Sequence, residues 1–222
     1  MHTVILMTAT LIVSYSSTLL AAEKFERASI VLERTIEDAD AEIKIDVMTK
    51  ASGLSSLRVA APDGRIIVDF KAPSSALGIH HLVLESPEPK DDGRLRADFP
   101  EGVYTLTGTT TDGVTMQAEA FLKHEFPPAA KIVTPHAGSD DVPPTELRVT
   151  WSPMKDIQSI TVLIEDEKSG REISAMLAGT ATSFTFPAGA LVSGRKYKLA
   201  VGSIGTTGNK TVTEIDFTTG KK

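Results

Sequence analysis

The chain has no cysteine among its 222 residues. A disulfide framework, a zinc site built of thiolates, a thiol nucleophile and a lipid-modified cysteine are therefore excluded. Aromatic residues are also scarce, at 5% of the chain with one tryptophan, which leaves few rings on which sugars or bases could stack. We expect the fold to be stabilised by its hydrophobic cores alone, without a cofactor.

Positive charge is in the minority. The chain has 23 Lys and Arg residues against 29 Asp and Glu, a formal net charge of -6. A chain with no basic excess has no field that attracts phosphates, so we expect no nucleic-acid partner. Anionic membrane surfaces are disfavoured for the same reason.

The first 22 residues carry no Asp, Glu, Lys or Arg, and residues 4–13 form an apolar run as long as the hydrophobic core of a signal peptide. A helix that crosses a bilayer needs about 20 apolar residues, and serines and threonines interrupt this segment. We predict that residues 1–22 are a signal peptide cleaved near Ala21 or Ala22. The remainder would be exported to the periplasm or the extracellular space, with no membrane insertion after cleavage. An uncleaved N-terminal anchor is the alternative.

After the leader, no long segment has the apolar period of a helix. Short alternating runs recur instead, as where Ile43, Ile45 and Val47 alternate with charged residues, and this period is typical of a strand with one buried face. Glycine-containing turns separate such runs. We therefore predict an all-β fold with one short helix over 92–99, ended by Pro100; the strands expected in the first half are 57–61, 65–70, 103–110 and 114–122.

Two consecutive prolines, Pro127 and Pro128, interrupt the strand pattern. Proline cannot donate to a sheet ladder and favours a stiff, extended chain. We place a domain boundary there and predict two tandem β-sandwich domains, residues 23–126 and 127–222, that fold separately because few contacts cross the prolines. The second half offers seven strands: 131–134, 146–151, 159–165, 171–177, 181–186, 196–204 and 211–218.

The sequence offers no convincing catalytic set. Ser152 and Lys155 have the spacing of acyl-transfer serine enzymes, but that pair must share a helical turn and Pro153 lies between them. Residues 205–211 superficially resemble a phosphate-binding loop, yet they link two strands where a helix N-terminus is required. We predict that the protein is not an enzyme and has no catalytic residue.

Metal binding is not indicated either. His80 and His81 are adjacent, and neighbours on a strand point to opposite faces, so one metal could not take both. The acidic run at 37–42 has Ile43 where a calcium loop needs glycine and Thr49 where it needs a bidentate glutamate. We predict no metal site.

The second half resembles a fibronectin type III domain over residues 127–219. Its stretch LRVTWSP, which contains Trp151, looks like the second strand of that family with its core tryptophan. Its stretch LVSGRKYKLAV looks like the family's tyrosine corner, in which the hydroxyl of Tyr197 would bond back to the backbone. The resemblance implies a β-sandwich and says little about function.

The first half is similar to a domain found ahead of fibronectin type III domains in secreted bacterial proteins. The matching stretches include APDGR at 61–65 and FPEGVYT at 99–105. This resemblance implies an immunoglobulin-like β-sandwich, and it brings no activity with it.

These observations predict a non-catalytic exported protein that acts as an interaction or scaffolding module for a protein partner. The alternative is an accessory protein that binds a small ligand or carbohydrate between the two domains, near residues 125–135. Within the second domain, the GTTGNK loop is the first candidate for binding because loops on a rigid sandwich can vary freely. The candidate binding residues in this loop are Thr206, Thr207, Asn209 and Lys210. The alternative interpretation is that the loop only connects the two strands of a hairpin.

Overall fold

The computed structural model describes residues 22–221 except 39, 51, 73, 75, 89 and 90. The predicted signal peptide falls almost wholly outside these residues, so its assignment stays a prediction. The described residues form fourteen strands and one short helix, which confirms the all-β fold class. No helix in this described part is long and apolar enough to cross a membrane.

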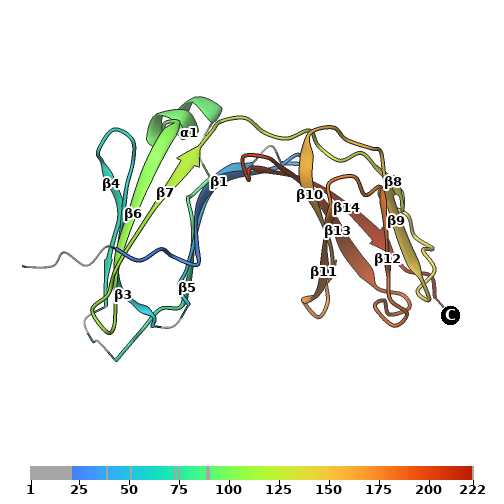
Figure 1. Ribbon diagram of the computed structural model, residues 1–222. Helices are drawn as coiled ribbons and strands as arrows, with labels where there is room; N and C mark the ends of the chain where they lie inside the picture. The colour runs from blue at the N-terminus through green and yellow to red at the C-terminus, as the bar shows by residue number, and fades with distance from the viewer. Residues whose placement is uncertain are drawn as a thin grey trace, which may run out of the picture.

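The first half folds as two packed sheets (Figure 1). Each sheet buries one face, since residues such as Leu32, Ile43 and Tyr104 are almost fully enclosed between them. The three-stranded layer is ordered β1 (Arg27–Thr35), β2 (Ala41–Met48) and β5 (His81–Glu85). The four-stranded layer is ordered β4 (Ile66–Lys71), β3 (Leu54–Ala60), β6 (Gly102–Thr110) and β7 (Thr115–Leu122).

The second half repeats this architecture around a core of its own. Its seven strands are those that the sequence predicts, with ends that differ by at most two residues. The smaller sheet is ordered β8 (Ile132–Thr134), β9 (Leu147–Trp151) and β12 (Ser183–Phe186). The larger is ordered β11 (Arg171–Ala178), β10 (Ile157–Asp166), β13 (Lys196–Gly205) and β14 (Lys210–Thr218).

Both sandwiches connect their strands in the same order, and in each a tyrosine hydroxyl bonds back to the backbone a few residues earlier. The backbone N–H of Val192 donates to the Tyr197 hydroxyl at 2.8 Å, as the resemblance implies. In the first sandwich the hydroxyl of Tyr104 donates to the carbonyl of Pro100 at 3.0 Å, a contact that we did not predict. In each case the tyrosine fixes the loop before its own strand. Trp151 is 3% exposed and lies in the second core, as expected.

The two sandwiches share a sheet. Strand β14 pairs with β1 in parallel, with Glu33 opposite Lys210 and Thr35 opposite Val212. A seven-stranded sheet therefore runs from β11 in the second sandwich to β5 in the first (Figure 1). The expectation that few contacts cross between the halves is wrong, because a strand pair that is distant in sequence joins them.

Candidate functional site

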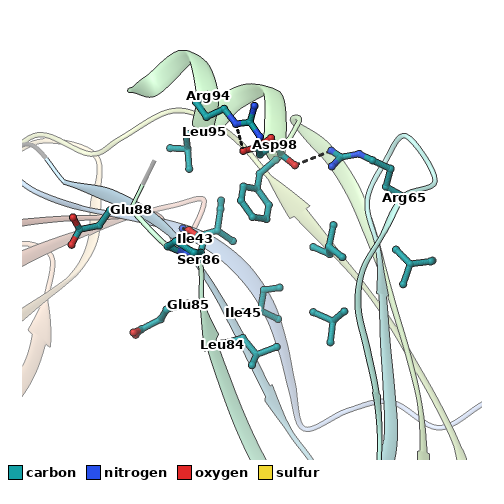
Figure 2. A pocket seen from close by; sticks show the side chains of 15 residues that line it. Ile43, Ile45, Arg65, Leu84, Glu85, Ser86, Glu88, Arg94, Leu95 and Asp98 are labelled. Atoms are coloured by element: carbon teal, nitrogen blue, oxygen red, sulfur yellow. Dashed lines mark hydrogen bonds and ion pairs between the residues drawn. The ribbon is translucent and has the colours of Figure 1, made fainter. Parts of the chain in front are cut away.

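An open groove of about 930 Å³ lies in the first sandwich between β4 and β5 (Figure 2). These two strands are the edge strands of opposite sheets, so nothing in the strand order closes this side of the sandwich. The helix α1 (Asp92–Asp98) covers one end. The groove is lined by Ile43, Ile45, Arg65, Ile66, Ile67, Val68, Leu84, Glu85, Ser86, Pro87, Glu88, Arg94, Leu95, Asp98 and Phe99.

The floor of the groove is apolar because alternate residues of β2 and β5 face inward. Ile43 and Ile45 are buried, at 1% and 5% exposed, and Leu84 lies opposite Ile45 in the strand register. Leu95 of α1 is buried above them, and Phe99 follows directly after the helix. The groove therefore opens straight onto the core of the first sandwich.

Local sequence keeps α1 over the end of the groove. The carboxylate of Asp91 accepts a hydrogen bond from the backbone N–H of Arg94 at 2.8 Å, which caps the first turn. The N–H of Phe99 closes the last turn on the carbonyl of Leu95, and Pro100 then prevents further helix. A helix with these start and stop signals presents Leu95 downward to the core.

Charged groups of both signs surround the apolar floor. Arg65 Nη2 donates to the carbonyl of Asp98 at 2.8 Å, and Arg94 Nε donates to the carboxylate of Asp98 at 2.6 Å (Figure 2). These bonds tie the start of β4 to the end of α1. On the other rim, Glu85 forms an ion pair with Lys44 at 2.8 Å. An apolar floor with a rim of mixed charge is suited to recognition of an amphipathic segment or molecule.

The polar sets that the sequence suggested are placed elsewhere. Ser152 and Lys155 lie in the connection between β9 and β10, without a helix to align them. His81 Nε2 lies 3.0 Å from Asp46 Oδ1, so this histidine is engaged on the outer surface of the sheet. No group of three or more potential metal ligands occurs among the residues that the structure describes.

The GTTGNK loop joins β13 to β14 beside the junction of the two sandwiches. Thr206 is exposed, whereas Asn209 is only 1% exposed. Asn209 Nδ2 donates to the carbonyls of Lys123 and Glu125 at 2.7 and 2.8 Å, and its Oδ1 accepts a bond from β1. The amide of Asn209 is thus fully used within the chain. Binding through the loop stays a prediction that would rest on Thr206 and its half-exposed neighbour Thr207.

Lys210 also takes part in the junction between the sandwiches. Its Nζ forms an ion pair with Glu33 of β1 at 3.0 Å. Lys44 of β2 contacts the same carboxylate at 3.4 Å. Opposite charges therefore alternate across neighbouring strands. The series runs from Lys210 on β14 through Glu33 and Lys44 to Glu85 on β5. Sequence reasoning placed Lys210 in a loop, but the structure places it in the shared sheet.

Residues 125–135 contribute to the junction and not to the groove. Ser203 Oγ donates to the carbonyl of Pro128 at 2.6 Å, and Thr211 Oγ1 donates to that of Pro127 at 2.7 Å. The guanidinium of Arg34 lies 3.9 Å from the centre of the Phe126 ring. The chain between the sandwiches is therefore fixed along the shared sheet.

No family model matches the sequence, and no curated protein matches it. Among solved structures, the chain is similar to fibronectin type III-like modules of Clostridium thermocellum CbhA, with 12% identity, 92% of this chain and 93% of that chain covered, and a TM-score of 0.36. A two-domain fibronectin type III segment of chicken tenascin has 12% identity, covers 89% and 100%, and has a TM-score of 0.34. A human collagen XX domain of this type has 19% identity, covers 41% and 91%, and has a TM-score of 0.34.

These similarities concern the fold alone. Independently of them, the structure has three strands facing four in each half, the same connectivity twice, and a tyrosine corner in each. The chain is thus built from two tandem β-sandwiches of the same topology. An immunoglobulin-like identity for the first of them stays a prediction.

Proposed function

We propose that the chain is an exported, non-catalytic interaction module that binds a protein partner in the groove between β4 and β5. The observation that carries this proposal is the groove itself, an apolar hollow that opens the core of the first sandwich to solvent. A contiguous apolar surface on a soluble domain is a common feature of binding sites. The charged rim then adds selectivity for one orientation of the partner.

The shared sheet favours a scaffolding role for the pair of sandwiches. Pairing between β14 and β1, together with the hydrogen bonds of Asn209, connects the two halves through backbone and buried polar groups. A junction of this kind restricts hinge motion more than a free linker does. A partner held in the groove would therefore keep a fixed position relative to the second sandwich.

Export is supported by the sequence of the first 22 residues, which combines an apolar core with small residues before Glu23. Periplasmic or extracellular location follows from this proposal. The absence of cysteine makes the fold independent of the redox state of that compartment.

The proposal is tested by affinity capture from envelope extracts with the mature chain and two tryptophan variants. Leu84→Trp adds bulk on the inner face of β5, where the groove lies, whereas Val83→Trp adds the same side chain on the outer face of the same strand. We expect Leu84→Trp to lose the captured partner and Val83→Trp to keep it. Equal capture by both, at matched thermal stability, would contradict a binding site in the groove.

A small apolar ligand is the second candidate for the same groove, because aliphatic side chains dominate its floor. Carbohydrate is disfavoured, since Phe99 is the one aromatic residue among those lining it. Native mass spectrometry of protein purified from its own envelope distinguishes this candidate. A bound mass that Leu84→Trp removes would support it.

A further inference from the structure

Strand β5 has one open edge. Two hydrogen bonds at the ends of the strand show which of its backbone groups face that edge. Thr49 N–H donates to the carbonyl of His80 at 3.0 Å, and Ser86 N–H donates to the carbonyl of Ile43 at 2.9 Å. In an antiparallel ladder, residues bonded to one neighbour alternate with residues whose backbone faces the other side. Even-numbered residues of β5 therefore bond to β2, and the N–H and C=O groups of Val83 face the open edge.

This open edge runs along the groove. Strand β5 is the last strand of the seven-stranded sheet, and its inward side chain Leu84 lines the hollow. A further strand placed next to β5, about 4.8 Å away, would direct every second side chain to the same inner face as Leu84. The hollow thus lies where the inward side chains of an added strand would point.

We propose that the partner supplies an extended segment that pairs with β5 and adds a strand to the seven-stranded sheet. Its apolar side chains, at alternate positions, fill the space between Leu84 and Ile67, while its backbone bonds to that of Val83 and Glu85. This inference rests on the proposed function and specifies how the groove is occupied. It follows the general mode of recognition in which main-chain bonds give affinity and side-chain pockets give selectivity.

The charges around β5 define the chemistry of this segment further. Glu85 is half exposed, and Glu88 is exposed just beyond the strand. The chain as a whole has a net charge of -6. The two arginines of the rim are already engaged within the chain, Arg65 with Asp63 and Arg94 with Asp98. A lysine or arginine beside the apolar positions of the partner would complement the glutamates on the β5 side of the rim, whereas an acidic segment would be repelled there. The occupant is therefore an extended apolar segment with basic flanks.

Strand β11, at the opposite end of the same sheet, provides a matched control. The N–H of Gly179 donates to the carbonyl of Gln158 at 3.2 Å, so odd-numbered residues bond to β10 and Met176 faces the open edge. Met176 is 71% exposed. No residue of β11 lines the groove. Met176→Pro and Val83→Pro each remove one outward N–H from an edge strand, and proline is tolerated at such positions.

The experiment uses the full mature chain and a library of capped peptides about seven residues long. Valine, isoleucine or leucine occupies alternate positions, with threonine and lysine between them. A second library has the same composition with the apolar residues grouped together. Binding is measured by fluorescence anisotropy for the native chain, Val83→Pro, Met176→Pro and Val83→Thr, after each variant has shown an unchanged circular dichroism spectrum.

We expect members of the alternating library to bind with Kd below about 1 mM, and the grouped library to bind more weakly. Val83→Pro should weaken binding at least ~10-fold, which corresponds to about 1.4 kcal/mol, while Met176→Pro and Val83→Thr leave it within about twofold. Absence of binding by the alternating library, or full binding by Val83→Pro, would overturn strand addition. If Val83→Pro also captures the envelope partner that Leu84→Trp loses, binding in the groove stands and the mode proposed here is wrong.

Discussion

Leu32 and Asn209 lie 177 positions apart in the chain, and the backbone N–H of Leu32 donates to Asn209 Oδ1 at 2.9 Å. Leu32 is fully buried in β1, so this N–H has no access to water. The other end of the same amide group bonds to two carbonyls of the segment before the prolines. One side chain of the second sandwich therefore satisfies three backbone groups of the first half.

Asn209→Ala should reduce the free energy of unfolding by roughly 1–3 kcal/mol, because it leaves the buried N–H of Leu32 without an acceptor. Denaturant titration followed by fluorescence measures the change. The matched control is Thr206→Ala in the same loop, which is exposed and should change stability by less than about 0.5 kcal/mol. Equal effects of the two substitutions would show that Asn209 does not stabilise the junction.

Separation of the two halves should lower the stability of both. Residues 23–126 and 127–222 retain separate cores, so each fragment is expected to show a cooperative transition. Each fragment loses the β1–β14 pairing, and each kcal/mol lost lowers the melting temperature of a domain this size by about 4–8 °C. Differential scanning calorimetry of both fragments and the intact chain tests this. Fragments as stable as the intact chain would mean that the shared sheet contributes nothing.

Trp151→Ala should cost roughly 3–5 kcal/mol, since it removes a large buried side chain and leaves the carbonyl of Ala181 without the indole N–H that donates to it at 2.9 Å. Tyr197→Phe removes only the hydroxyl that accepts from Val192 and should cost about 0.5–1.5 kcal/mol. Thermal and chemical unfolding of the two variants should show this ranking. An unchanged melting temperature for Trp151→Ala would disprove the core assignment.

Tyr104 should make stability fall at high pH. Burial raises the pKa of Tyr104 to about 12, against a smaller opposing effect of Arg65, while an unfolded tyrosine titrates near pH ~10. Between these two values the folded state holds a proton that the unfolded state has lost. The stabilisation that Tyr104 contributes is therefore complete below pH ~10 and is lost as the pH rises towards ~12. The free energy of unfolding of the native chain and of Tyr104→Phe, measured across this pH range, isolates the contribution of the Tyr104 hydroxyl. A constant difference between them would contradict the assignment.

The sequence predicted the elements whose pattern is set locally. Alternation identified β2, and glycine turns with alternating runs located all seven strands of the second sandwich. Strand β1 was missed because it is half-buried along most of its length, with one edge paired to β14, a partner far away in the chain. Strand β5 has only five residues, and its polar ends, His81 and Glu85, resemble a loop.

The candidate groove could not be predicted for a related reason. It forms where the edges of two different sheets meet, and no spacing in the sequence indicates that β4 and β5 face each other. Asn209 illustrates the converse case, since a polar residue between Gly208 and Lys210 looks solvent-exposed. Its burial depends on the linker that passes beside it. Only the tertiary arrangement shows that the expected binding residue belongs to the junction.

Site-specific photo-crosslinking in the intact envelope tests the central claim most directly, because it traps a partner of any identity at a defined position on the chain. A photoreactive phenylalanine analogue replaces Ile66 at the rim of the groove, where the side chain is 45% exposed. The same analogue replaces the exposed Thr206 in the loop of the second sandwich. The account predicts a discrete crosslinked product from position 66 and none from position 206. A product from position 206 alone would place the partner on the loop and contradict binding in the groove.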